Sequence, residues 1–372
     1  MREIFSRSRP GPIGLDVGTE NVRLLQLTQV AGNLRVQAAG QWQFPEGLSS
    51  PGADPVARAS QAGDGIRQLL RKNAFRGRDV ISCLRTEQLA IRNVRLPRMH
   101  QAELERAMMY EAQERLGFEV TPDRVYYVSA GEIRTGAEAA QEVLLMGVPA
   151  QAVQDHVALL EAARLRPRHI DSEPTALLRA YERCMRRIQD EEQMVVVLDI
   201  GYSSTRVVVA RGQTPLLIKT IDIAGRKFNE SVARELNLPY AEAAHIRRRG
   251  GAGTDWPVID AIRPHAEALA GEVGLCLRYC SVTFRGLRPS RLIATGGEAY
   301  DVSLLKLLGE QLNCECVLGE PLRGMDLHQA GFDGDRRGTL TEWSVATGLA
   351  LRDMPCSAQK EAENYETRRI PA

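Results

Sequence analysis

Two stretches of this chain, 183 residues apart, share one pattern: a strand, a tight turn and a second strand. They read IGLDVGTENVRLLQL (13–27) and VLDIGYSSTRVVVA (197–210). Three residues recur at the constant offset (199 − 16 = 183): Asp16 on Asp199, Gly18 on Gly201 and Arg23 on Arg206. A chain that begins two segments with the same hairpin is expected to fold into two similar halves.

The remaining segments predict an α/β protein with an insertion. Each hairpin leads into further strand-like runs, and helical patterns follow, including one stretch over 228–249 and a long helix over 258–284. From residue 97 the sequence pattern changes: it predicts a charged amphipathic helix, two strands and another helix. We therefore predict these parts: a first half at 12–96 plus 168–190, an inserted α+β subdomain at 97–167, a second half at 191–352 with a smaller part at about 226–285, and a polar tail at 353–372.

Composition excludes several classes of function. The chain has 48 Lys and Arg against 47 Asp and Glu, so its formal charge of +1 provides no global field for nucleic acid or an acidic membrane. The seven cysteines are scattered and the six histidines stand singly, which argues against a disulfide framework or a zinc site. No run of 18 apolar residues and no signal-peptide start occurs, so we expect a soluble cytoplasmic protein without direct membrane insertion.

The repeated Asp-X-Gly turn has a chemistry suited to phosphates. Its glycine lets the backbone approach a phosphate closely and offer N–H donors, while its aspartate can hold Mg²⁺ through water. Two such turns facing each other would hold a polyphosphate from both sides. Neighbouring polar residues extend the two loops: Thr19, Glu20 and Asn21 in the first, Ser203 and Ser204 in the second. The simpler reading is that Asp16 and Asp199 only satisfy backbone donors in their own turns.

A third element, ATGGEA (294–299), follows a predicted strand and precedes a predicted helix. At such a place a glycine pair can admit a flat base or a ribose, and the helix N-terminus favours anions. We therefore expect Gly296, Gly297 and Glu298 to contact a nucleotide.

In order and spacing these three motifs resemble the actin, Hsp70 and sugar-kinase superfamily, and within it the PilM family of type IV pilus assembly, related to the cell-division protein FtsA. The stretches LPRMHQAELERAMMYEAQERLGF and DIAGRKFNESVARELNLPYAEAAHIR carry the same likeness, which covers about residues 12–352. The resemblance implies an actin-like, ribonuclease H-like duplicated fold with an FtsA-type insert.

The resemblance also implies a cytoplasmic scaffold that binds ATP with Mg²⁺, with Asp16 and Asp199 holding the metal through water and at most slow hydrolysis. It adds Gly225 and Arg247 to the cofactor-binding residues. The family places a Glu and a Lys where this chain has Ala244 and Arg247, and small residues followed by a proline-glycine turn where this chain has Glu298, Tyr300 and Asp301. Arg247 could still stack on adenine or bond a ribose hydroxyl.

The partner implied by the resemblance is the N-terminal cytoplasmic peptide of PilN, an inner-membrane protein, with other pilus assembly proteins reached indirectly. It places the protein in the cytoplasm, peripheral to the inner membrane through this partner. It puts the peptide groove between the first half and the insert, so we expect contacts near Val94, Leu96, Met109 and Tyr127.

Several alternatives stay open. Glu173, at a predicted helix start, could position an attacking water or could simply favour the helix dipole. The cluster RRRG (247–250) is expected to be a solvated helix cap rather than a nucleic-acid site. The whole chain could instead be a nucleotide-free interaction module, a sugar kinase of the same fold or a self-associating filament former.

Overall fold

A computed structural model describes most of the chain, which divides into two compact units. Unit 1 comprises residues 1–85, 153–180 and 320–364, and unit 2 comprises 86–152, 181–319 and 365–372. The described residues are 10–45, 47–49, 52–135, 138–182, 194–249, 256–284, 288–328, 330–332, 338–354 and 368–369.

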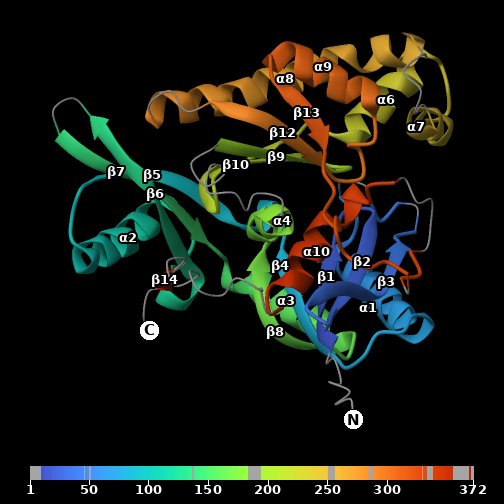
Figure 1. Ribbon diagram of the computed structural model, residues 1–372, viewed down its shortest axis with the longest axis horizontal. Helices are drawn as coiled ribbons and strands as arrows, with labels where there is room; N and C mark the ends of the chain where they lie inside the picture. Colours follow the sequence, from blue (N-terminus) through green and yellow to red (C-terminus); the bar gives the residue numbers. More distant parts are fainter. Residues whose placement is uncertain are drawn as a thin grey trace. The chain divides into compact units, whose positions relative to one another are not determined.

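Unit 1 is built on a five-stranded mixed sheet of order β3-β2-β1-β4-β8 (Figure 1). Its strands are β1 (Pro10–Val17), β2 (Asn21–Val30), β3 (Asn33–Gln43), β4 (Asp79–Leu84) and β8 (Arg166–Ser172). The associated helices are α1 (Pro55–Lys72), α3 (Ala150–Ala162), α4 (Glu173–Glu182) and α10 (Ser344–Leu351), with a short 3₁₀ turn at Thr341–Trp343; a further 3₁₀ turn, Thr86–Gln88, begins unit 2. One apolar cluster joins β1 and β2 to α1, and a second joins β2 and β3 to α10.

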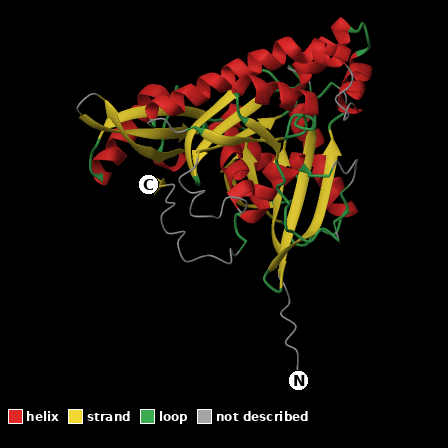
Figure 2. Cartoon of the chain, turned by 45° about the horizontal axis from the view of Figure 1, so that its top comes forward, coloured by secondary structure: helices red, strands yellow, loops and turns green. Residues whose placement is uncertain are grey.

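Unit 2 contains a second five-stranded sheet, of order β11-β10-β9-β12-β13. Its strands are β9 (Met194–Ile200), β10 (Thr205–Arg211), β11 (Thr214–Ile221), β12 (Pro289–Thr295) and β13 (Glu315–Leu318). Its helices are α6 (Gly225–Glu235), α7 (Tyr240–Arg249), α8 (Trp256–Thr283) and α9 (Val302–Leu312). Helix α8 runs unbroken in Figure 2 despite Pro264, and it packs its buried face into one apolar core with the sheet.

The two sheets confirm the predicted duplication. In each, the first two strands form the antiparallel hairpin that carries the repeated motif, and the first strand also pairs in parallel with the strand that follows a helical segment, β4 or β12. The turn hydrogen bond is repeated too, from Gly18 N to Asn21 O at 2.9 Å and from Gly201 N to Ser204 O at 3.1 Å. The same sequence pattern therefore folds into the same local geometry twice.

The insert forms a small antiparallel sheet covered by one helix. The order is β14-β6-β7-β5, with β5 (Ala90–Pro97), β6 (Val125–Thr135), β7 (Glu138–Gly147), β14 (Arg368–Arg369), helix α2 (Gln101–Arg115) and a 3₁₀ turn at Pro122–Arg124. Ala130, Ile133 and Ala140 lie in the same apolar core as the second sheet. The four strands and α2 that make up this insert lie in unit 2. Helix α3, which the sequence reading placed inside 97–167, falls mostly in unit 1, and β5 begins at Ala90, before the predicted boundary.

Two features of the structure differ from the sequence reading. The helical stretch expected over 228–249 is two helices, α6 and α7, because Asn237 adopts a left-handed φ of 51° and Pro239 follows it. Met354, at the expected start of the polar tail, packs in the core of unit 1, and residues 355–367 lie outside the described part of the chain.

No helix among the described residues is both long and apolar enough to cross a membrane.

Candidate functional site

The first turn stands at the carboxyl end of β1. Asp16 is 6 % exposed and faces Arg23 across the hairpin, with 3.8 Å between its Oδ2 and the Nη1 of Arg23. Thr19 and Glu20, which join β1 to β2, are half-buried, and so is Asn21 at the start of β2. The carboxylate therefore has a cationic neighbour within its own hairpin, at the edge of a sheet where α/β proteins place their ligands.

Helix α1 brings an arginine to this turn that the sequence reasoning missed. Arg58 donates to the Gly18 carbonyl from Nη2 and to the Leu48 carbonyl from Nη1, each at 2.6 Å, and its guanidinium lies 3.9 Å from the Phe44 ring centroid. Burial, together with the positive charge of Arg85, lowers the pKa of Arg58 to about 10. The group stays protonated at neutral pH and adds positive charge beside the turn.

Glu173 lies at the same edge of unit 1. Strands β1, β4 and β8 run parallel to one another, and Glu173 directly follows β8 as the first residue of α4. Its side chain is 3 % exposed. A buried carboxylate at the carboxyl ends of these strands is compatible with either reading of the sequence, a water-positioning group or a helix-dipole partner.

The second turn repeats the first with a tighter ion pair. Asp199 Oδ2 lies 2.6 Å from Nη1 of Arg206, and both residues are 6 % exposed. The nearby Ser204 hydroxyl donates to Glu87 Oε1 at 2.5 Å, which holds the end of the turn, whereas Ser203 is half-buried. Two backbone hydrogen bonds attach α6 to the turn, from Gly225 N to Gly201 O at 3.1 Å and from Arg226 N to Tyr202 O at 2.8 Å.

The Gly296–Gly297 loop closes on the same turn, because β12 runs parallel to β9 and ends beside Asp199. Gly296 has a φ of 92°, and a Cβ there would lie 2.5 Å from Asp199 Oδ1 and 2.5 Å from Ile200 O. Only glycine permits this approach. Gly297 is exposed, and no atom lies within 4 Å of the position its Cβ would take. The loop thus combines one crowded glycine with one open glycine.

Arg247 reaches this region from α7. Its exposure is 4 %, so the expectation of a solvated cap is wrong for this arginine. It is ion-paired to Glu298 through Nη2 and to Asp301 through Nη1, the latter at 3.4 Å, and its Nε donates to Asn229 Oδ1 at 2.7 Å. Sequence spacing could not have revealed this network, since its members come from α6, α7 and the loop after β12.

The residues expected to hold a nucleotide therefore form two groups of known geometry. Unit 1 brings Asp16, Gly18, Thr19, Glu20 and Asn21 together at one turn, and unit 2 brings together Asp199, Gly201, Ser203, Ser204, Gly225, Arg247, Gly296, Gly297 and Glu298. Within the described residues no cluster of three His, Cys, Asp or Glu side chains could bind a metal by itself. A metal here would need oxygen ligands from phosphate or water.

The residues expected near a peptide groove lie in the insert. Val94 and Tyr127 are 1 % and 3 % exposed and belong to the core beneath α2, whereas Leu96 and Met109 pack at its margin and are partly exposed. The Tyr127 hydroxyl accepts a hydrogen bond from Gln101 Nε2 at 2.8 Å. Leu96 and Met109 are therefore the two of these four that an extended peptide can reach.

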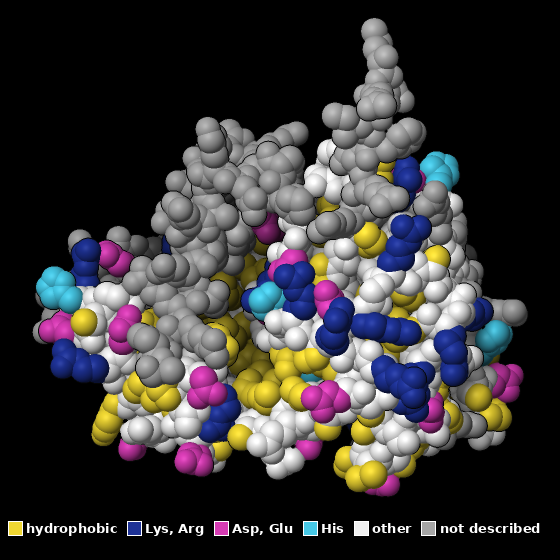
Figure 3. Space-filling model, turned by 90° about the horizontal axis from the view of Figure 1, so that it is seen from below, with side chains coloured by type: hydrophobic (Ala, Val, Ile, Leu, Met, Phe, Trp, Pro, Cys, Tyr) yellow, Lys and Arg dark blue, Asp and Glu magenta, His cyan; other side chains and the backbone are white. Residues whose placement is uncertain are grey.

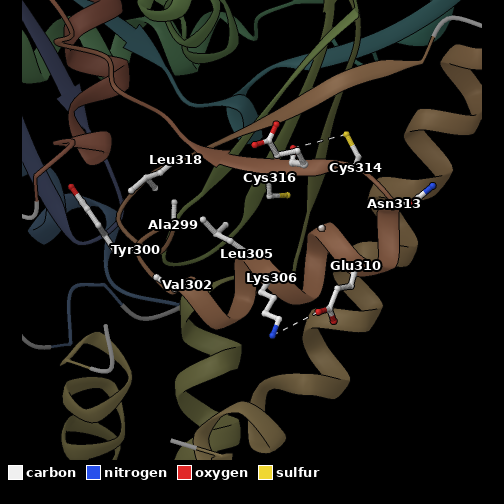
Figure 4. A pocket seen from close by; sticks show the side chains of 12 residues that line it. Ala299, Tyr300, Val302, Leu305, Lys306, Glu310, Asn313, Cys314, Cys316 and Leu318 are labelled. Atoms are coloured by element: carbon white, nitrogen blue, oxygen red, sulfur yellow. Dashed lines mark hydrogen bonds and ion pairs between the residues drawn. The ribbon is translucent and has the colours of Figure 1, made fainter. Parts of the chain in front are cut away.

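Two further features lie on the surface. On the face drawn in Figure 3, Lys and Arg side chains lie next to Asp and Glu side chains at several places. An open groove of about 820 Å³ runs between α9 and β13, and Val302, Leu305 and Leu318 form part of its wall (Figure 4). None of the residues expected to hold a nucleotide lines this groove.

Solved structures with the same architecture cover nearly the whole chain. A chain of the PilM-PilN type IV pilus biogenesis complex is 26 % identical, with a TM-score of 0.73, over 92 % of this chain and 98 % of that one. The ethanolamine utilization protein EutJ from Carboxydothermus hydrogenoformans is 14 % identical, with a TM-score of 0.54, over 92 % and 89 %. MreB5 of Spiroplasma citri bound to ADP is 11 % identical, with a TM-score of 0.51, over 93 % and 96 %. The last two likenesses establish the actin-like fold alone.

The amino-acid sequence also matches a protein family. The match extends over residues 14–354, from within β1 to Met354 in the core of unit 1, and the family is described as type IV pilus assembly protein PilM. Both aspartate-glycine turns, strands β5, β6 and β7 with helix α2, and the glycine loop lie within the matched range. This chain is therefore a member of the PilM family of type IV pilus assembly proteins.

Proposed function

We propose that this chain is a cytoplasmic scaffold of type IV pilus assembly that binds the N-terminal cytoplasmic peptide of a PilN protein. The main support is the likeness to the PilM-PilN complex, which extends over 98 % of that chain at 26 % identity. Through this partner the scaffold is held at the inner membrane and meets other pilus assembly proteins indirectly.

The insert offers a surface suited to an extended peptide. Strand β5 pairs with β7 on one side and ends the order of the described sheet, and Leu96 lies on it. An extended peptide can bind through main-chain hydrogen bonds, with apolar side chains supplying selectivity. We propose Leu96 and Met109 as the apolar contacts for this peptide.

The test is titration of the protein with a synthetic peptide of the PilN cytoplasmic N-terminus. Leu96→Asp and Met109→Asp should each weaken binding, because a charge cannot be buried against an apolar anchor without cost. Leu275→Asp is the matched control, since Leu275 is 52 % exposed on α8, outside the insert. Absence of peptide binding to the unmodified protein, with and without nucleotide, would contradict the scaffold function.

We also propose that the chain binds ATP with Mg²⁺, using both repeated turns. The support lies in the glycine turns at the carboxyl ends of strands, each with a buried aspartate, and in the cationic Arg58 beside the first turn. When bound, ATP would supply a polyanion whose phosphates and metal stabilise one arrangement of the protein. Asp16 and Asp199 would orient metal-bound water, and Arg58 would attract the phosphates. Glu173 remains the candidate for slow hydrolysis.

Calorimetry with ATP and Mg²⁺ tests this part. Asp16→Ala and Arg58→Leu should each weaken ATP binding, whereas Asp222→Ala should not, since Asp222 pairs with Lys227 on the surface. An affinity unchanged by Asp16→Ala would exclude the first turn from the site. If ATP governs the scaffold, it should also change the affinity for the PilN peptide, which titration at saturating ATP measures.

One observation favours a second candidate, a scaffold that works without nucleotide. Arg247, expected to contact the base, is already engaged by Glu298, Asp301 and Asn229. In that case the peptide would bind with the same affinity whether or not ATP is present.

A further inference from the structure

The region around Gly225 in unit 2 has the construction of a nucleotide-binding corner. The N-terminus of α6, the turn after β9 and the loop after β12 meet there, joined by the bonds from Gly225 N to Gly201 O and from Glu298 N to Ile200 O, each 3.1 Å. Parallel strands β9 and β12 both end at this place. In open α/β sheets such a place accepts ligands, and a helix N-terminus there favours a negative charge.

The side chain of Glu298 already occupies this corner. A Cβ placed on Gly225 would lie 2.4 Å from Glu298 Cδ and 2.6 Å from both Cγ and Oε1, so the carboxyl group rests directly on the glycine. Glu298 is 4 % exposed. The space that the absent side chain of Gly225 leaves open is therefore filled by the chain's own carboxylate.

Arg247 supplies the positive charge that pairs with the Glu298 carboxylate in this corner. It pairs with Glu298, lies 3.4 Å from Asp301 and is 4 % exposed. Asp301 has a second task, since its Oδ1 accepts from Leu304 N at 3.0 Å as the N-cap of α9. The positive charge of Arg247 is thus neutralised inside the protein, where a nucleotide would otherwise use it.

We propose that Glu298 is a built-in competitor of the nucleotide: its side chain fills the base and ribose side of the corner and must leave before a nucleoside can enter. The inference rests on the proposed binding of ATP and reverses the expected role of Glu298 from ligand contact to occupant. The binding-competent state is the one in which the Glu298 side chain has left the corner. A population of about one tenth for that state makes the apparent affinity for the nucleotide roughly tenfold weaker than the affinity of the vacated corner. Glu298 therefore sets how strongly the protein responds to nucleotide.

The experiment measures ATP and adenosine binding by calorimetry for the unmodified protein, Glu298→Ala and Glu298→Gln. Removing the side chain should tighten binding of both ligands by about tenfold. Glutamine should give a smaller gain, because its amide still fills the space over Gly225. Tripolyphosphate should gain less than ATP, since it has no nucleoside to occupy the space that the Glu298 side chain leaves over Gly225. Glu310→Ala is the matched control, because Glu310 is a solvent-exposed α9 carboxylate paired with Lys306.

The possible results are distinct. If the unmodified protein binds ATP and Glu298→Ala binds it equally or less well, the competitor role is wrong while ATP binding stands. If neither protein binds ATP, both proposals fail. A gain for tripolyphosphate as large as that for ATP would also overturn the base-side assignment. Circular dichroism and the thermal midpoint of each variant establish that it is folded, and Glu298→Gln preserves the test if Glu298→Ala does not fold.

Discussion

Asp199 and Arg206 form a buried ion pair across the second hairpin, with 2.6 Å between Oδ2 and Nη1 and 6 % exposure of each residue. The equivalent pair in the first hairpin, Asp16 and Arg23, is looser at 3.8 Å. In both hairpins the arginine stands directly opposite the aspartate in the strand register. The repeated aspartate therefore has a structural partner in each half, whatever ligand it also serves.

This difference predicts unequal costs for removing the two arginines. Arg206→Met should lower the free energy of unfolding by about 3–5 kcal/mol, because the Asp199 carboxylate would stay buried without its counter-charge. Arg23→Met should cost clearly less, since its pair is longer. Urea denaturation of both variants measures the two values, and equal losses would contradict this account. Adding Asp199→Asn to Arg206→Met should recover part of the stability.

The contact between Gly225 and Glu298 predicts strong coupling between two substitutions. Gly225→Ala should destabilise the protein by about 1–3 kcal/mol, because its new methyl group would overlap the Glu298 carboxyl. In a Glu298→Ala background the same change should cost little, since the space is then vacant. A double-mutant cycle by chemical denaturation measures this coupling. Additive effects would show that the two residues do not share that space.

Replacing a glycine by alanine should lower the stability of the protein in one helix and raise it in another. A Cβ at Gly348 of α10 would lie 1.8 Å from the Ala176 carbonyl oxygen of α4. Because this oxygen belongs to the backbone and cannot rotate away as a side chain can, Gly348→Ala should lower the free energy of unfolding by about 3 kcal/mol or more. At Gly271 of α8 nothing lies within 4 Å, so alanine should add about 0.5–1 kcal/mol through helix propensity. Thermal midpoints of the two variants, measured side by side, give both signs.

His156 makes the stability of the protein depend on pH. Burial lowers its pKa from 6.5 to about 4, and its Nε2 lies 2.8 Å from the Ser82 hydroxyl. Because the folded state holds the ring neutral, its contribution is complete above pH 6.5 and is lost as the pH falls from 6.5 towards 4, by at most about 3 kcal/mol. His156→Asn should flatten this part of the stability profile.

Much of the candidate site was predictable because its parts are local in sequence. Asp16, Gly18, Asp199 and Gly201 sit in hairpins whose strands are adjacent in the chain, so the pattern alone specifies the turn and its hydrogen bond. Arg58 was missed because it is distant in sequence: it belongs to a helix that begins 37 residues after Gly18 of the first turn (55 − 18 = 37), and no spacing rule connects the two. The split between α6 and α7 could have been read from Asn237 and Pro239.

By itself the sequence determined the duplicated α/β architecture, the two aspartate-glycine turns and the family, because strand periodicity, turn chemistry and family likeness are written in consecutive residues. The tertiary structure decided which charged side chains pair with one another. Arg247, Asn229 and the two carboxylates Glu298 and Asp301 come from three separate segments, α7, α6 and the loop after β12, and their pairing arises only when those segments pack together and exclude water. Burial raises the cost of leaving any one of these charges alone, so the folded chain pairs groups that the sequence shows only as scattered polar residues.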